Sequence, residues 1–164
     1  MKLRLKELGI DWLCIMAYLL LLALFFLAFY QFAFHGFIPK MNEMTIQVLV
    51  TIVSVLVIIL VFAFLDYKKG GTIGKQKSNL TVVFEKPSFK ASILRNLIKF
   101  LPWQFGHMGT LHMLQMNFEY DYTAMIYHYL AIFLALTMLL MGLIRKDGRH
   151  LGDLLAKTQV VEKK

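Results

Sequence analysis

Three long stretches of the chain contain no Asp, Glu, Lys or Arg and almost no other polar residue. They are residues 12–34, 44–65 and 124–144. A helix needs about 20 consecutive apolar residues to cross a bilayer. Of the 164 residues, 59% are hydrophobic and 17% are charged, whereas a soluble domain averages about 25% charged. One core in a chain of this length cannot bury so much apolar surface, so we expect an all-α membrane protein and exclude a soluble or disordered chain.

The positions of the Lys and Arg residues favour a fourth crossing. Basic residues concentrate in cytoplasmic segments close to the ends of spans. Three crossings would divide the 18 Lys and Arg residues 11 to 7, but a further crossing by 100–118 leaves only Lys40 on the outer side. We therefore predict four spans, at about 11–34, 44–65, 100–118 and 124–144. The alternative is that 100–118, which is polar for a span, forms a re-entrant or interfacial helix.

Four spans place both termini, the loop 66–99 and the tail 145–164 in the cytoplasm, as one domain over residues 1–164 in the cell (inner) membrane. Apolar residues recur at helical spacing through 86–99, so we expect an amphipathic helix there, lying on the cytoplasmic leaflet. The net charge of +8 then indicates contact with anionic headgroups rather than nucleic acid. The basic residues expected to face lipid are Lys68, Lys69, Lys75, Lys77, Lys90, Arg95 and Lys99.

The two halves of the chain resemble each other. Gly70, Gly74 and Val82-Val83 recur 78 residues later as Gly148, Gly152 and Val160-Val161. We predict two helical hairpins related as a parallel repeat. The short runs 80–84 and 158–161 are then able to pair as two strands. Chance coincidence of glycines is the alternative explanation.

Asp11 stands at the start of the first span. Ionisable groups inside a membrane are rare and usually functional, although a helix N-terminus also favours an Asp through its dipole. Arg4 lies two helical turns earlier on nearly the same face, so it could reach Asp11. A partner for Asp11 from another segment is equally compatible with the sequence.

The third span carries a polar stripe. At about 100° per residue, Gln104, His112 and Gln115 fall within an arc of about 80°, and His107 lies about 60° to one side. Such a face should meet protein or water rather than lipid. One interpretation is a proton or cation path, since histidine exchanges protons near neutral pH. The other is hydrogen bonding between helices, with Gln47, Thr51 and Ser54 as partners.

The sequence offers no enzyme signature. The sequence contains no recognisable Ser–His–Asp set, Cys–His set or carboxylate pair of a hydrolase. The segment 70–75 lacks the full phosphate-loop motif, and no apolar strand precedes it. His107 and His112 are about 140° apart on a helix, so they cannot share a metal ion, and His128 adds no ligand spacing. We expect no catalytic residue, no metal and no cofactor.

The chain resembles the bacterial RDD family of membrane proteins, which is named for one arginine and two aspartates. The corresponding positions are Arg4, Asp11 and Asp153, and the segments 71–75, 80–83, 95–103 and 153–161 are similar to family motifs. Gly152 and Lys157 depart from the family pattern, which has a His and a Gly there. The resemblance covers nearly the whole chain and implies cation/proton antiport for some members.

Two functions remain open at this point. The first is a secondary transporter, expected to be a homodimer, that exchanges protons for a small cation. The second is a module that binds, assists or regulates another membrane protein.

Overall fold

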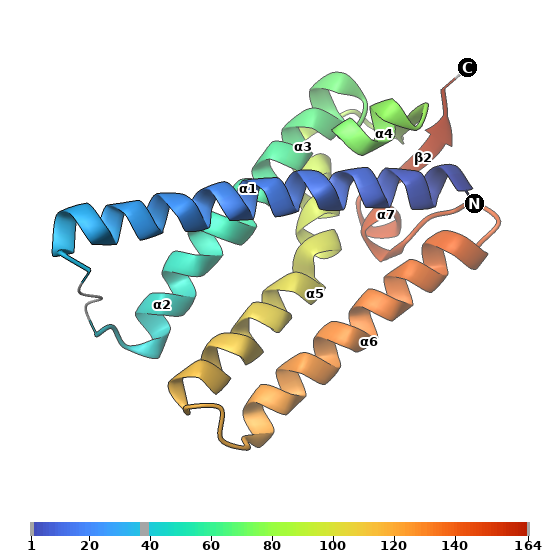
Figure 1. The fold of residues 1–164 in the computed structure, drawn as a ribbon. Coiled ribbons are helices and arrows are strands. Elements are labelled where there is room, and N and C mark those ends of the chain that lie inside the picture. Colours follow the sequence, from blue (N-terminus) through green and yellow to red (C-terminus); the bar gives the residue numbers. More distant parts are fainter. Residues whose placement is uncertain (1, 37–39, 164) are drawn as a thin grey trace.

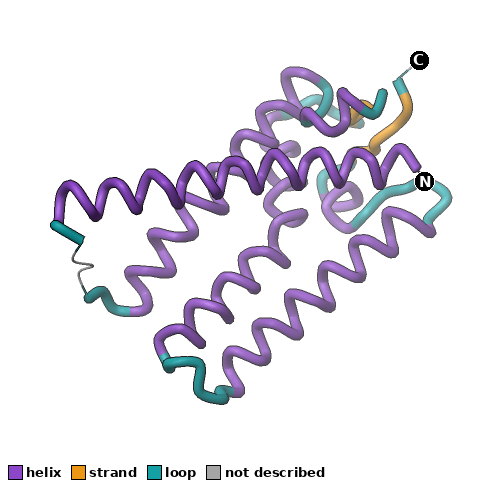
Figure 2. The backbone as a smooth tube through the Cα atoms, viewed as in Figure 1, coloured by secondary structure: helices purple, strands orange, loops and turns teal. Residues whose placement is uncertain are grey.

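The computed structural model describes residues 2–36 and 40–163. Residues 37–39 of the expected outer loop and Lys164 of the basic tail lie outside this range. The described chain is mostly helical, as expected, with two short strands (Figure 2). Helix α1 spans Lys2–Phe34. A second long helix follows as three segments, α2 (Glu43–Val50), the π-helical η1 (Thr51–Leu56) and α3 (Val57–Lys69).

The remaining elements are two further long helices and the short pieces that follow each hairpin. They are α4 (Ile73–Lys77), β1 (Leu80–Phe84), α5 (Phe89–Gln115), α6 (Tyr122–Ile144), α7 (Leu151–Leu155) and β2 (Thr158–Glu162). Figure 1 shows the N and C termini together at one end, while the α1–α2 and α5–α6 connections lie at the opposite end.

Among the residues that the structure describes, three helices are long and apolar enough to cross a membrane, namely α1, the continuous helix Glu43–Lys69, and α6. Their outward faces expose large apolar side chains, among them Leu21 at 66% and Phe133 at 66%. Soluble proteins rarely expose apolar surface on this scale, because water would have to cover it. The small apolar core lies instead where α1, α3 and α5 meet, and it is made of Ile15, Val55, Ile58, Ile59, Phe62 and Phe100.

The prediction of a separate surface helix over 86–99 is wrong. Residues 89–99 form the first part of α5 and continue without a break through Pro102 into the expected third span. One face of this segment buries Ser92, Arg95 and Asn96. Residues 89–99 do form an amphipathic helix, as the apolar spacing predicted. Its polar face, however, packs into the protein and does not face lipid headgroups.

The expected strands are confirmed. β1 and β2 pair antiparallel, with Val82 opposite Val160, and Leu80, Val82 and Val160 form a second small apolar cluster. This ladder ties the segment after the first hairpin to the segment after the second.

The short elements recur at the predicted spacing. Helices α4 and α7 have five residues each and begin 78 residues apart, at Ile73 and Leu151. Gly70 and Gly148 both adopt positive φ, at 69° and 60°, a conformation that glycine adopts without strain. The repeat of the spans themselves stays a prediction.

Candidate functional site

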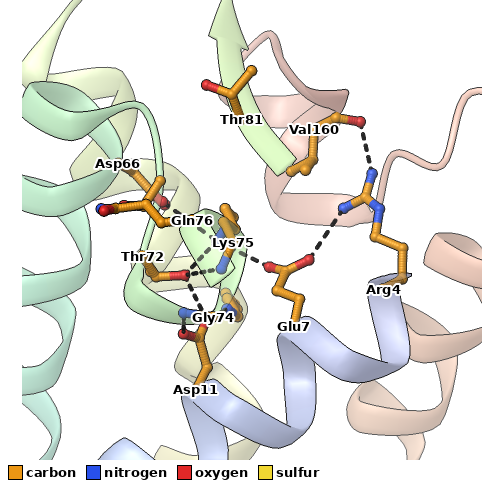
Figure 3. Close-up of polar contacts among 12 residues, drawn as sticks. Arg4, Glu7, Asp11, Asp66, Thr72, Gly74, Lys75, Gln76, Thr81 and Val160 are labelled. Atoms are coloured by element: carbon orange, nitrogen blue, oxygen red, sulfur yellow. Dashed lines mark hydrogen bonds and ion pairs between the residues drawn. The ribbon is translucent and has the colours of Figure 1, made fainter. Parts of the chain in front are cut away.

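Helix α1 presents three charged residues on one face. Arg4, Glu7 and Asp11 follow one another at spacings of three and four, which places them on one side of the helix. Glu7 and Asp11 are 4% and 3% exposed, although they carry charge and the residues that follow them in the helix are almost all apolar. Glu7 and Asp11 point toward α4 and its N-cap, and Arg4 points toward β2 (Figure 3), so the start of α1 is held by polar contacts.

Asp11 receives two hydrogen bonds from the turn after α3. Gly70, in left-handed conformation, ends that helix, and Thr72 caps the N-terminus of α4. The Thr72 hydroxyl donates to Asp11 Oδ2 at 2.6 Å, and the Gly74 backbone N–H donates to Oδ1 at 2.8 Å. A Cβ on Gly74 would lie 2.4 Å from the Glu7 carbonyl oxygen, so only glycine allows α4 to approach α1 this closely.

Lys75 is completely buried and lies between carboxylates of two helices (Figure 3). Its Nζ is 3.1 Å from Glu7 Oε1 and 3.3 Å from Asp66 Oδ1, and it donates to Thr72 Oγ1 at 3.2 Å. The expectation that Lys75 faces lipid is therefore wrong. Two neighbouring carboxylates stabilise a buried ammonium, which a headgroup could do only at the surface.

Arg95 joins the two halves of the chain. It is 1% exposed, and its Nη1 donates to Asp66 at 2.6 Å while its Nε donates to Asp153 at 2.7 Å. Asn96 adds a hydrogen bond to Asp66 at 3.1 Å. The prediction that Arg95 faces lipid is therefore also wrong. Its planar guanidinium is buried because it binds two carboxylates at once. Lys99, 17% exposed in its side chain, lies 3.9 Å from Asp11 Oδ2.

The other four residues predicted on the basic surface are exposed in the structure; they are Lys68, Lys69, Lys77 and Lys90.

Asp153 is held by contacts from α5, α7 and β2. Besides Arg95, the Thr158 hydroxyl donates to Asp153 Oδ1 at 2.9 Å. Burial alone would raise the pKa of Asp153, but the attraction of Arg95 outweighs it and lowers that pKa below the usual range. Asp153 therefore stays ionised.

His150 and Asp153 form a capping box at the start of α7. The backbone N–H of Asp153 donates to Nδ1 of His150, so the hydrogen of the neutral ring sits on Nε2, which faces Asp153 Oδ2 at 3.3 Å. Burial lowers the pKa of His150 to about 3, and the ring is neutral at physiological pH.

Arg4 anchors the N-terminus to the tail rather than to Asp11. Its Nη2 donates to the carbonyl of Val160 at 2.8 Å and to that of Gly148 at 3.4 Å, and its Nη1 lies 3.8 Å from Glu7. The sequence left two partners open for Asp11, either Arg4 or a group from another segment. In the structure the partners are Thr72 and Gly74, which come from another segment.

These residues make a single charged cluster at the end of the molecule where the termini lie. The structure brings together the three predicted motif residues Arg4, Asp11 and Asp153. Sequence reasoning missed Glu7 and Asp66 as members. Glu7 shares the helical face of Arg4 and Asp11, which was the available signal. The charged cluster comprises four acids and four bases, namely Glu7, Asp11, Asp66, Asp153, Arg4, Lys75, Arg95 and Lys99.

The polar stripe of α5 faces the π-helical segment η1. Gln104 and Thr51 exchange hydrogen bonds at 2.9 and 3.3 Å, and His107 Nε2 lies 3.5 Å from the Ser54 hydroxyl. The expected contacts with Thr51 and Ser54 are thus present. Gln47 instead donates to Glu43 within its own helix at 2.7 Å.

His112 lies near the far end of the same stripe, between two carboxylates. Its Nδ1 is 2.9 Å from Glu43 and its Nε2 is 3.0 Å from Asp121. Gln115, the last residue of α5, is exposed. Within the described residues no group of three or more His, Cys, Asp or Glu is arranged to hold a metal ion.

The chemistry of the charged cluster is that of a balanced ionic network. Removing one member of a buried ion pair typically costs about 3–5 kcal/mol, because the other charge is left uncompensated. The network therefore fixes how α1, α3, α5 and the tail sit together.

Comparison with curated proteins and with solved structures found no match. The model of the RDD family matches residues 4–157, nearly the whole chain. That range includes Arg4, Asp11 and Asp153, and the long apolar helices fit the membrane location of its members. The chain belongs to the RDD family of membrane proteins.

Proposed function

We propose that this integral membrane protein is a secondary transporter that exchanges protons for a small monovalent cation. The observation on which the proposal rests is a line of ionisable and hydrogen-bonding side chains that follows α5 from one end to the other, with His107 and His112 about 140° apart around the helix. It begins at the charged cluster, continues through Gln104 and His107, and ends at His112 between Glu43 and Asp121.

The residues of this line have the chemistry that a proton path requires. Imidazole can accept and release a proton near neutral pH, and the hydroxyls of Thr51 and Ser54 can relay hydrogen bonds. Both hydroxyls lie in η1, and π-helical turns inside α-helices occur frequently at functional sites. Asp11, at the cluster end, would offer the carboxylate that takes up the cation or the proton.

The proposal includes four crossings, with α5 as the additional span and both termini in the cytoplasm of a bacterial cell. Helix α5 has 27 residues, about 40 Å at the usual rise. Its first three turns lie in the charged cluster, and residues 100–115 extend about 24 Å beyond it, against a hydrocarbon thickness of about 30 Å. It contacts α6 through a stacked Phe105–Tyr127 pair with ring centroids 6.4 Å apart. The shared end of both termini agrees with an even number of crossings.

A second function is favoured by the balance of the charged cluster. Each of its four acids lies within 4.0 Å of a Lys or Arg, which is also what a purely stabilising network requires. On that basis the protein would be a non-transporting module that binds or regulates another membrane protein, or a second copy of itself, with its exposed basic residues toward anionic headgroups.

Vesicle assays separate the two functions. Purified protein in sealed vesicles with an imposed pH gradient should drive Na⁺, Li⁺ or K⁺ flux. The isosteric change Asp11→Asn should lower that flux at least about tenfold, since removing the charge removes the ion's partner. Lys90→Gln, on the exposed face of α5, is the matched control and should transport normally.

Folding must be shown to be intact for the comparison to count. The thermal midpoint of Asp11→Asn in detergent should lie well above the temperature of the flux assay, so that the variant is folded when its flux is measured. Absence of flux of all three ions through correctly inserted native protein would refute transport. Co-purification of a membrane protein partner in that case would support the module.

A further inference from the structure

A cavity of about 770 Å³ lies between α1, α5 and α6. One end is charged, with Arg4, Asp11 and Lys99 in its wall, and the other is apolar. The charged end lies on the side of the molecule where the termini meet, and the apolar end extends along α6 toward Ala131. The cavity therefore has the polarity of an amphiphile that stands with its headgroup at a membrane surface.

The wall contributed by α6 carries small residues at three positions of one face, namely Ala131, Ala135 and Gly142. Ala131, Ala135, Met138 and Gly142 follow one another at spacings of four, three and four residues, and all four line the cavity. Such spacing places them along one side of the helix. The small volume of Ala131, Ala135 and Gly142 leaves space between the larger apolar residues Ile132, Met138, Leu139 and Leu143 of the same wall.

The rim of the cavity is open to the apolar surroundings of the helices. Leu8 and Trp12 of α1 are 40% and 56% exposed, and Ile132 and Leu139 of α6 are 56% and 40% exposed. Tryptophan is enriched at the membrane–water boundary. A lipid could therefore enter sideways from the bilayer.

Lys99 is the member of the charged cluster with the weakest protein partner. Its closest carboxylate oxygen, on Asp11, is 3.9 Å away, whereas Lys75 has two carboxylate oxygens within 3.3 Å. The Lys99 ammonium stands instead over the rings of Phe62 and Phe100, 5.3 and 5.6 Å from their centroids. A largely buried ammonium gains from an additional anionic oxygen.

The acids of the same wall do not oppose an anion strongly. Both oxygens of Asp11 already accept hydrogen bonds, from Thr72 and Gly74. Glu7 lies 3.1 Å from Lys75 and 3.8 Å from Arg4. Lys99 therefore remains as the group able to contact an anion inside the cavity. The guanidinium of Arg4, which donates to the carbonyls of Val160 and Gly148, adds positive charge to the same wall.

We propose that the cavity binds one anionic phospholipid of the bilayer, with its phosphate at Lys99, near the positive charge of Arg4, and an acyl chain along Ala131, Ala135 and Gly142. The charge of the polar end selects the headgroup, and the small residues of α6 admit the chain. The proposal does not depend on transport, since a bound lipid would equally brace α1 against α6 in a protein that moves no ion.

Lipid retention tests the proposal. The full chain is reconstituted with a mixture of phosphatidylglycerol and phosphatidylcholine, extracted in mild detergent, and the retained lipid is counted by native mass spectrometry. Phosphatidylglycerol should be retained as a single molecule and be enriched over its share of the mixture. Lys99→Gln should reduce its retention about tenfold, since a charge-assisted contact is lost. Lys90→Gln, on the same helix but exposed, should retain it fully.

A second variant guards against misfolding of the first. Ala135→Trp fills the apolar part of the cavity without altering any charge, and it should expel lipid while the thermal midpoint is kept or raised. Equal retention of both lipids by the native protein, or undiminished phosphatidylglycerol in Lys99→Gln, would overturn the proposal. So would a lipid-free dimer that dissociates in Ala135→Trp, because the occupant would then be a second copy.

Discussion

Two glycines, Gly74 and Gly152, decide whether the charged cluster can close. A Cβ on Gly74 would lie 2.4 Å from the backbone oxygen of Glu7, and one on Gly152 would lie 2.7 Å from that of Arg95. Each glycine therefore lets a short helix, α4 or α7, rest directly on the backbone of a long one. The ion pairs of Lys75 and Asp153, one residue further along each short helix, depend on these contacts.

Gly74→Ala should destabilise the protein, because backbone atoms cannot move aside as a flexible side chain can. Overpacking of this kind costs roughly 1–3 kcal/mol, which should appear as a lower thermal midpoint in detergent. Gly9→Ala is the control on α1, since a Cβ there meets nothing within 4 Å; it should be neutral or slightly stabilising. Equal midpoints for the two variants would contradict the packing described.

At the scale of elements, α5 combines two segments that the sequence treats separately. Its first three turns supply Arg95 and Lys99 to the charged cluster, and its remainder carries the polar stripe toward His112. Pro102 removes one backbone hydrogen bond inside it, yet the helix continues. Helix α7 is the opposite case, because its five residues are too few to be stable alone. The capping box of His150 and Asp153 and the contact with α5 hold it.

The cap of α7 predicts that acid weakens the fold. Burial lowers the pKa of His150 to about 3 from a usual 6.5, so between these values the unfolded chain binds a proton that the folded protein does not. Stability then falls as the pH drops through that window, by about 1.4 kcal/mol per pH unit at most. Asp153, with a lowered pKa in the folded state, acts in the same direction.

His150→Asn isolates the contribution of the imidazole. Asparagine caps helices well and does not titrate, while Asp153 is retained in both proteins. Thermal midpoints measured between pH 7 and pH 4 should therefore fall less steeply in the variant. Parallel pH profiles would mean that the ring takes up its proton in the folded state.

For the molecule as a whole, the arrangement of the termini makes a prediction about topology. In a background with Cys14 replaced by Ser, a cysteine at Tyr120 should react with an impermeant thiol reagent added outside intact cells. A cysteine at Lys163 should react only after the membrane is opened, because an even number of crossings keeps the tail inside. Labelling of the Lys163 position from outside would require an odd number of spans.

Much of this architecture could be predicted from local pattern. The long apolar runs predicted helices at 11–34, 44–65 and 124–144, and the structure has them at 2–34, 43–69 and 122–144, so the first begins about two and a half turns earlier than predicted. The β-branched runs predicted the ladder. The position of residues 89–99 could not be predicted this way. An amphipathic helix has the same spacing whether its polar face meets headgroups or buried carboxylates, and Asp66 and Asp153 are 29 or more residues from Arg95 in the chain.

Composition and hydrophobic length, which are properties of the chain itself, were sufficient to predict membrane insertion and the helical class, because the bilayer demands apolar segments of one length. The motif residues Arg4, Asp11 and Asp153 were assigned by resemblance to the RDD family. The pairing of Lys75 and Arg95 with acids from distant segments, and the cavity beside Lys99, were decided only by the packing of α1, α5 and α6. The energy of an ion pair depends on the distance between its charges. For residues far apart in sequence, that distance is set only by the packing of the helices.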